Sequence, residues 1–179
     1  MLAKEFMKVL EQYPDGTLFV DLFGGSGLLS HITKSLKPHS TVIYNDFDNY
    51  RFRMKHIPQT NQLLADIREM VGNSVPRHKI IKGELRERIF SRIEQEENST
   101  GYVDFITLSS SILFSMKYKL SVQDMRKEAL YNNIRKTGYP ECTDYLEGLE
   151  IVSCDYKEVF NRYKDIPGVV FLVDPPYLS

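Results

Sequence analysis

Short apolar runs occur near both ends of the chain, and each has the length of a buried strand. The last of them, GVVFLVD, is apolar almost throughout, as in strands that are covered on both faces of a parallel sheet. Helical stretches separate the runs. This alternation predicts an α/β fold with a mostly parallel sheet and helices on its faces. The strands are expected near 18–22, 41–45, 149–153 and 169–173.

Two helices are predicted around the first strand. Apolar residues recur at helical spacing over residues 2–10 and again over 28–36. The turn residues Pro14 and Gly16 should end the first stretch, and Pro38 should end the second. The second helix joins the first two strands, which is the crossover that neighbouring parallel strands require.

The middle of the chain differs from its two ends. It is long, polar and mostly helical in pattern, whereas the strand pattern returns only near the carboxyl end. We therefore expect a core domain built from residues 1–50 and 149–179. Residues 51–148 would form a mainly helical insertion.

Within this insertion, apolar residues repeat at four-residue spacing from Leu85 to Ile93 and predict a helix. The polar run EQEENSTG (94–101) is expected to end it, with EQEEN as a solvated loop. The apolar stretch 102–116 fits either a helix or buried extended chain, and a further helical segment is predicted from Ser121.

The formal net charge of the 179 residues is −1, so the overall charge does not favour binding to a polyanion. Any such contact would need a local basic patch. Two clusters are candidates, although either could be an ordinary solvated face: Arg51, Arg53, Lys55 and His56, and Lys117, Lys119, Arg126 and Lys127.

Cys142 and Cys154 have no CxxC spacing, and no histidine cluster accompanies them. A metal site or a disulfide framework is therefore not expected. No apolar run approaches the length of a membrane span, and the first residues do not form a signal peptide. The cytoplasm is the expected compartment.

The glycine turn GGSG (24–27) directly follows the first predicted strand. Glycine lets a ligand approach the backbone, because no Cβ stands in the way. Asp46 follows at roughly the spacing of a ribose-binding acid in a nucleotide fold. This pair fits NAD as well as S-adenosylmethionine, although Ser30 stands where GxGxxG has its last glycine. A P-loop sequence does not occur.

Four acids come at the ends of predicted strands, namely Asp21, Asp46, Asp155 and Asp174. Ligands of open α/β sheets bind beyond the carboxyl ends of the strands. A single acid in such a place is usually a turn or capping residue. Four of them would converge on one crevice, which predicts a ligand site there.

The sequence Asp174-Pro175-Pro176-Tyr177 suits the chemistry of an exocyclic amine. An adenine amine is a poor nucleophile because its lone pair is delocalised into the ring. The Asp174 carboxylate and the Pro175 carbonyl could accept its two N–H groups and localise the lone pair. The prolines would stiffen the turn, and Tyr177 could stack on a base flipped out of a duplex.

Four segments together resemble the Dam-like (D12 class) adenine-specific DNA methyltransferases: FVDLFGGSG (19–27), YNDFD (44–48), LEIVSCDYKEV (149–159) and FLVDPPY (171–177). They occur in the order of that family, with its long insertion between the second and the third. The resemblance implies a Rossmann-like S-adenosylmethionine-dependent methyltransferase sheet. It also implies double-stranded DNA as the substrate and DNA recognition by the insertion.

The resemblance further implies roles for single residues. Asp21 and the turn that contains Gly24, Gly25 and Gly27 would hold the methionine part of S-adenosylmethionine, and Phe23 belongs to the same site. Asp46 would bind the ribose hydroxyls. Asp155 would accept from the cofactor's adenine amine, with Tyr156 against the ring where the family usually has Phe. Asp174, Pro175, Pro176 and Tyr177 would carry catalysis.

Two features depart from the family. Residues 1–17 contain nothing like its Gly-Gly-Lys element, and its catalytic domain continues well past the position of Tyr177. This chain is therefore expected to be a truncated form with weak or no activity. The alternatives are an RNA or other N-methyltransferase and a cofactor-binding module without turnover. An NAD-dependent enzyme is disfavoured by the DPPY sequence.

Overall fold

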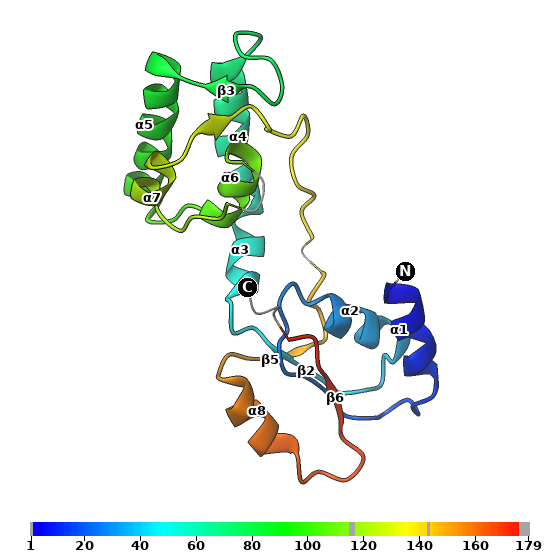
Figure 1. The fold of residues 1–179 in the computed structure, drawn as a ribbon. Coiled ribbons are helices and arrows are strands. Elements are labelled where there is room, and N and C mark those ends of the chain that lie inside the picture. The colour runs from blue at the N-terminus through cyan, green and yellow to red at the C-terminus, as the bar shows by residue number, and fades with distance from the viewer. Residues whose placement is uncertain (1, 115–116, 143, 176–179) are drawn as a thin grey trace. The chain divides into compact units, whose positions relative to one another are not determined.

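The computed structural model describes residues 2–114, 117–142 and 144–175. The chain divides into two compact units (Figure 1). The core unit comprises Met1–Met54 and Cys142–Ser179, and the insertion unit comprises Lys55–Glu141. The second segment of the core unit thus begins at Cys142, whereas the sequence pattern places its beginning at residue 149.

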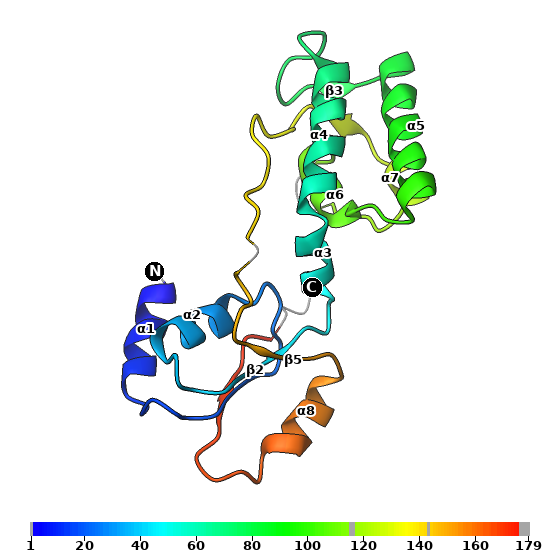
Figure 2. The same cartoon turned by 180° about the vertical axis from the view of Figure 1, so that it is seen from behind.

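The core unit is built on one parallel sheet of four strands in the order β5-β2-β1-β6 (Figures 1 and 2). Phe19 of β1 is aligned with Val42 of β2 on one side and with Val170 of β6 on the other. The predicted strands and their parallel sheet are confirmed. The elements of this unit are α1 (Leu2–Glu11), β1 (Phe19–Asp21), α2 (Leu28–Leu36), β2 (Val42–Asn45), α3 (Tyr50–Lys55, of which Lys55 alone belongs to the insertion unit), β5 (Glu150–Val152), α8 (Tyr156–Tyr163) and β6 (Val170–Leu172).

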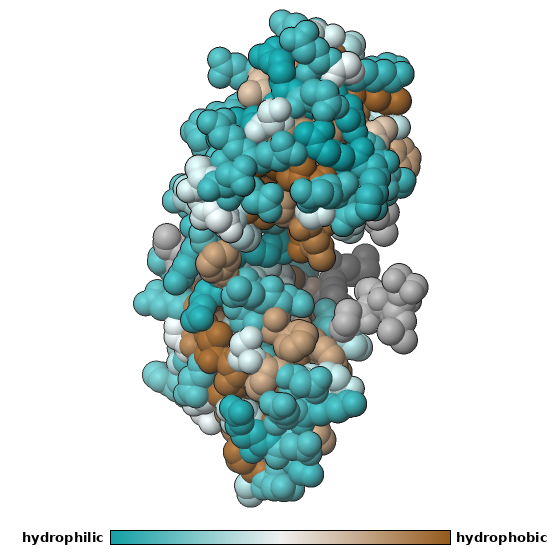
Figure 3. All heavy atoms as spheres, turned by 90° about the vertical axis from the view of Figure 1, so that its left-hand side faces the viewer, coloured by the Kyte–Doolittle hydropathy of each residue, from teal (hydrophilic) through white to brown (hydrophobic). Residues whose placement is uncertain are grey.

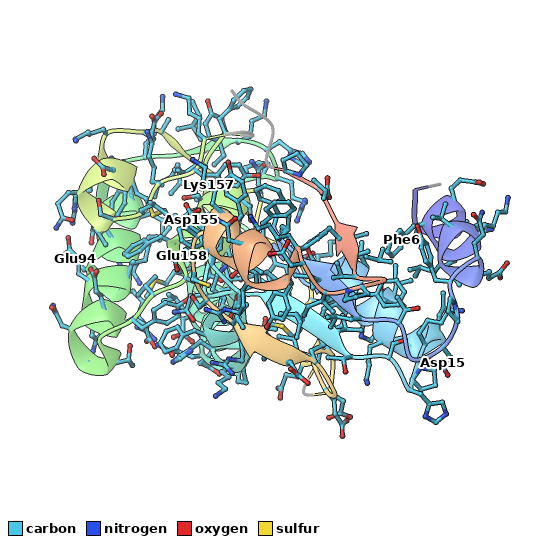
Figure 4. The ribbon with its side chains drawn as sticks, turned by 90° about the horizontal axis from the view of Figure 1, so that it is seen from below. Phe6, Asp15, Glu94, Asp155, Lys157 and Glu158 are labelled. Atoms are coloured by element: carbon cyan, nitrogen blue, oxygen red, sulfur yellow. The ribbon has the colours of Figure 1, made fainter. Side chains whose placement is uncertain are left out.

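Helices cover both faces of this sheet because successive strand residues point to opposite sides. Phe19 and Val42 pack with Leu10 of α1 on one face. Val20 and Ile43 pack with Val159 of α8 on the other face. On the first face, α1 also directs Phe6 toward the sheet (Figure 4). The two central strands, β1 and β2, are therefore buried on both sides, which explains their continuous apolar runs.

The insertion unit is mainly helical and has a hydrophobic core of its own, in which Ile67, Phe90 and Leu108 are fully buried. It also contains a two-stranded antiparallel ribbon, β3–β4, that the sequence pattern did not predict. Strands of two residues are too short to show an alternating pattern. The elements are α4 (Ile57–Val71), β3 (Ile80–Ile81), α5 (Gly83–Thr100), α6 (Phe105–Ile112), α7 (Val122–Arg126) and β4 (Leu130–Tyr131).

The prediction of a loop at EQEEN was wrong, because α5 runs through this segment and ends at Thr100, with Gly101 as its C-cap. Glu96 continues the buried face of Ile93 by one turn and accepts hydrogen bonds from Gln59 (2.9 Å) and Arg92 (2.8 Å). Its polarity is thus satisfied inside the unit, and Glu and Gln favour helix. In the next stretch, 102–116, the helix α6 occupies Phe105–Ile112.

Among the described residues, no helix is long and apolar enough to cross a membrane.

Candidate functional site

The topology of the sheet brings the predicted acids to one edge. The chain passes from β1 to β2 and then to β5 on one side, whereas β6 lies on the other side of β1. The strand order therefore reverses at β1, and ligands of open α/β sheets bind at such a switch point. The glycine turn follows β1, and Asp174 and Pro175 follow the neighbouring β6.

The glycine turn is shaped by its contacts with β2. A Cβ on Gly24 would lie 2.3 Å from the carbonyl oxygen of Asn45 and 2.5 Å from the ring of Tyr44. Gly27 has a left-handed φ of 76° and begins α2 without a side-chain cap. The first N–H groups of α2 thus carry a positive partial charge that no side-chain cap offsets, which suits a carboxylate ligand.

We expect Gly24→Ala to lower the free energy of unfolding by about 1–3 kcal/mol or more, because the added methyl group would collide with backbone as well as with a buried ring. Urea denaturation of the full-length protein would measure the change. A loss below roughly 0.5 kcal/mol, the usual effect of a surface substitution, would contradict this packing.

Asp21 is buried at the end of β1 and accepts a hydrogen bond from the Ser30 hydroxyl at 2.7 Å. The backbone N–H groups of Phe23 and Gly24 also donate to it. Burial raises the pKa of Asp21 to about 6, against the lowering effect of these donors, and the charge of nearby Asp174 adds to the rise. The carboxylate therefore holds the backbone of the glycine turn through hydrogen bonds and contributes negative potential to the crevice.

Asp46 is also buried, and its carboxylate accepts from the backbone N–H groups of Tyr50 (2.5 Å) and Arg51 (3.2 Å) at the start of α3. The Tyr44 hydroxyl lies 3.2 Å from it and 2.9 Å from the carbonyl oxygen of Gly25. The two backbone N–H groups use two of about four acceptor positions of the carboxylate, and the single Tyr44 proton is shared between Asp46 and the Gly25 carbonyl. At least one position is left for a ligand hydroxyl.

Asn45 joins the ends of three strands, a role that the sequence analysis missed. Its side-chain amide donates to the carbonyl oxygens of Leu22 and Cys154, both at 2.9 Å, and its oxygen accepts from the Cys154 N–H at 3.1 Å. This buried side chain therefore fixes the loops after β1 and β5. A polar residue at the end of an apolar strand was the available signal.

Asp155 caps α8 by accepting from the Lys157 N–H at 2.8 Å, and it is exposed with Lys157 at the start of this helix (Figure 4). The next residue, Tyr156, lies against Phe23 with ring centroids 4.9 Å apart. Both rings line an open, almost entirely apolar groove of about 420 Å³. The residues that line this groove are Leu22, Phe23, Tyr156, Lys157, Phe160, Asn161, Val173 and Pro175.

The groove connects two parts of the predicted site, because Pro175 and the Phe23–Tyr156 pair both line it. Asp174 is exposed at the end of β6, close enough to Asp21 to affect its titration. Pro176 and Tyr177 lie outside the described residues. Phe160 and Asn161 were missed because a helical pattern does not tell which face meets the crevice.

Residues before β5 also lie over the glycine turn. The ring of Tyr145 stacks on His31 of α2 with centroids 4.3 Å apart, and His31 Nδ1 donates to the carbonyl oxygen of Tyr145 at 2.8 Å. The side chain of Leu146 lies 2.8 Å from the place of a Cβ on Gly27. Apolar side chains thus shield one side of this turn from water.

No group of three or more His, Cys, Asp or Glu in the described part of the chain could hold a metal ion. The residues gathered at this edge of the sheet supply carboxylates, backbone groups and aromatic rings. A doubly wound parallel sheet, a glycine turn after its first strand and acids at the strand ends together define a Rossmann-like fold of the methyltransferase type.

All of the chain, residues 1–179, matches the family described as D12 class N6 adenine-specific DNA methyltransferase. The chain belongs to this family, which confirms the resemblance seen in the sequence. Methyltransferases of this kind use S-adenosylmethionine. A protein of Haemophilus influenzae, which is provisionally named as a methyltransferase, is 38% identical to this chain over 182 residues. The match covers 99% of this chain and 60% of that protein, and no solved structure matches.

Proposed function

We propose that the protein transfers a methyl group from S-adenosylmethionine to the N6 amine of adenine in double-stranded DNA. The observation that carries this proposal is the pairing of β1 with β6. It brings the glycine turn next to Asp174 and Pro175 at the point where the strand order reverses. A cofactor on the turn and an amine at Asp174 would therefore be neighbours.

The residues of the crevice fit the cofactor. When bound, S-adenosylmethionine supplies an electrophilic methyl group on a positively charged sulfur. Asp21 and Asp174 contribute negative charge that favours a sulfonium. The start of α2 suits the cofactor's carboxylate, since no side chain caps it. Asp46 is the proposed ribose ligand through its remaining acceptor position.

The apolar groove suits the adenine ring of the cofactor. Tyr156 offers an aromatic face there, and Asp155 is exposed beside it to accept from the adenine amine. Phe23 backs Tyr156 and would keep its ring in place. The assignment of Asp155 and Tyr156 to the cofactor rests on this combination of an acceptor and a flat apolar surface.

For the reaction itself, the Asp174 carboxylate and the Pro175 carbonyl would accept the two N–H groups of the target amine. These bonds draw the lone pair out of conjugation and aim it at the methyl group. A carboxylate is too weak a base to deprotonate a neutral arylamine, so Asp174 orients the amine and the proton leaves after methylation has made the nitrogen cationic. Tyr177 is assigned to stacking on the flipped base by resemblance.

Methyl transfer from labelled cofactor by the full-length protein would test the proposal. We expect label in adenine N6 of duplex DNA, and none in pools of RNA or protein. Label in RNA or protein would favour another N-methyltransferase, whereas cofactor binding without transfer would favour a binding module. Because its substrate is DNA, we propose the cytoplasm as its compartment.

Replacing Asp46 tests the cofactor site. We expect Asp46→Ala to cost roughly 1.5–3 kcal/mol of S-adenosylmethionine affinity, because a charge-assisted hydrogen bond to the ribose is removed. The same change removes the acceptor for Tyr50 and Arg51 at α3. Asp46→Asn keeps a neutral acceptor there and should lose less. Unchanged affinity of both variants in calorimetry would refute the ribose assignment.

A further inference from the structure

The basic side chains of the insertion unit differ in whether they form ion pairs with carboxylates. The cluster that the sequence singled out at 117–127 is neutralised. Lys117 and Lys119 both pair with Glu128, at 2.6 and 3.1 Å. Arg126 pairs with Glu87 and Glu94, and Lys127 pairs with Asp124. These cations therefore hold the surface of their own unit together.

A second group is not neutralised. Arg77, Lys79, Arg135 and Lys136 are exposed, and none of them forms an ion pair with a carboxylate of the described residues. The segments that carry them, 72–82 and 130–140, contain no Asp or Glu. The same segments add His78, which is exposed as well.

The β3–β4 ribbon brings these two segments together, although they are far apart in the sequence (Figures 1 and 2). Beyond the aligned pair Ile80–Tyr131, the His78 N–H donates to the Asn132 carbonyl and the Asn132 N–H donates to the Lys79 carbonyl, both at 2.9 Å. We call the resulting set the ribbon basic surface. It consists of Arg77, His78, Lys79, Arg135 and Lys136.

Backbone and ring contacts hold this surface in place. Arg77 donates through Nη1 to the carbonyl oxygen of Ile134 at 2.7 Å. The Arg135 guanidinium lies 4.2 Å from the centre of the Tyr139 ring, and Arg68 donates to the Arg135 carbonyl at 2.9 Å. Each guanidinium carries five N–H donors. These contacts orient the Arg77 and Arg135 side chains and leave donors for an anion.

We propose that the ribbon basic surface binds the phosphate backbone of the DNA substrate, an assignment that rests on the proposed function. Cations that lack carboxylate partners gain most from a polyanion, because no ion pair has to be broken. A surface that inserts into a membrane interface carries exposed large apolar side chains among its cations. Ile80 is the one strongly exposed apolar side chain at the ribbon among the described residues. Figure 3 shows that hydrophilic residues cover most of the insertion unit on the face it draws.

Two triple variants of the full-length protein provide a matched test, since each removes three positive charges. The first, Lys79→Gln with Arg135→Gln and Lys136→Gln, alters the ribbon basic surface. The second, Lys117→Gln with Lys119→Gln and Lys127→Gln, alters the paired cluster. Binding of a short DNA duplex would be measured between about 50 and 200 mM salt. Circular dichroism would check that both variants are folded.

For the ribbon variant we expect the slope of log affinity against log salt to fall by about 0.9 for each phosphate that is no longer neutralised, up to about 2.7 in all. Its affinity should drop alike for all duplex sequences. The control should keep the slope of the unaltered protein. Equal slopes in both variants would overturn the proposal. Binding of both variants to anionic lipid vesicles would also be measured, and a ribbon variant that loses vesicle binding while it keeps DNA binding would overturn the proposal as well.

Cofactor affinity and methyl transfer separate this inference from the proposed function. Both variants should bind S-adenosylmethionine like the unaltered protein, because neither change touches the core unit. If the unaltered protein methylates DNA and the ribbon variant binds and methylates as the control does, the surface assignment alone fails. If the unaltered protein neither binds nor methylates DNA, both the proposed function and the surface assignment fail.

Discussion

We expect Asp174→Ala to reduce methyl transfer by the full-length protein at least about 10²-fold, the effect of removing a preorganised group that acts on the reacting centre. The carboxylate is exposed beside the groove and follows β6 directly, so it is positioned to meet a base amine. Without it, only the Pro175 carbonyl would remain to orient that amine. Single-turnover methyl transfer from labelled cofactor would measure the loss.

Cofactor binding distinguishes this role from a general defect of the site. Asp174→Ala should retain most of its affinity for S-adenosylmethionine, because the glycine turn and Asp46 are unchanged. Asp174→Asn keeps an acceptor but loses the charge, so its turnover should lie between that of the unaltered protein and that of Asp174→Ala. Asp48→Ala, at an exposed acid beyond β2, is the control and should leave turnover unaltered. Full turnover of Asp174→Ala would refute the mechanism.

The second large effect concerns the stability of the core unit between pH 4 and pH 8. The pKa of Asp21 rises from 3.8 to about 6 on folding, mainly because its carboxylate is buried. The folded state therefore holds the proton more tightly than the unfolded state. Its contribution to stability is fully present below pH 3.8 and is lost as the pH rises through 6. The free energy of unfolding should fall by up to about 3 kcal/mol over this range.

Asp21→Asn isolates this contribution, because the amide is close in shape and does not titrate. The free energy of unfolding, measured with urea at several pH values, should decrease more steeply in the unaltered protein than in this variant. Asp48→Asn removes an exposed carboxylate at the same edge and should leave the steep decrease in place. Parallel curves for the unaltered protein and Asp21→Asn would contradict the buried carboxylate.

Much of the core unit could be predicted from the sequence. The four strands are short apolar runs between helical stretches, and this pattern depends only on which positions are buried. The glycine turn and the acids follow those strands directly, so their common edge follows from the parallel sheet. The family resemblance used the same segments, and the match over residues 1–179 confirms it.

The insertion was predicted less well, since its pattern depends on contacts between distant segments. EQEEN looks like a loop because it is polar, yet Glu96 is buried where Gln59 and Arg92 donate to it. The sequence also marks Lys117 and Lys119 as a basic cluster. Only the tertiary structure brings Glu128 within ion-pair distance of both.

The sequence by itself thus determined the class of fold, the family, and which strands are followed by the glycine turn and by acids. The tertiary structure decided which of these groups are buried, which are paired and which face the crevice. It buried Asp21 and raised its pKa, and it joined 72–82 to 130–140 through the β3–β4 ribbon. The physical reason is that periodicity records the burial of each position along one element, whereas pairing and desolvation arise between elements that the sequence does not connect.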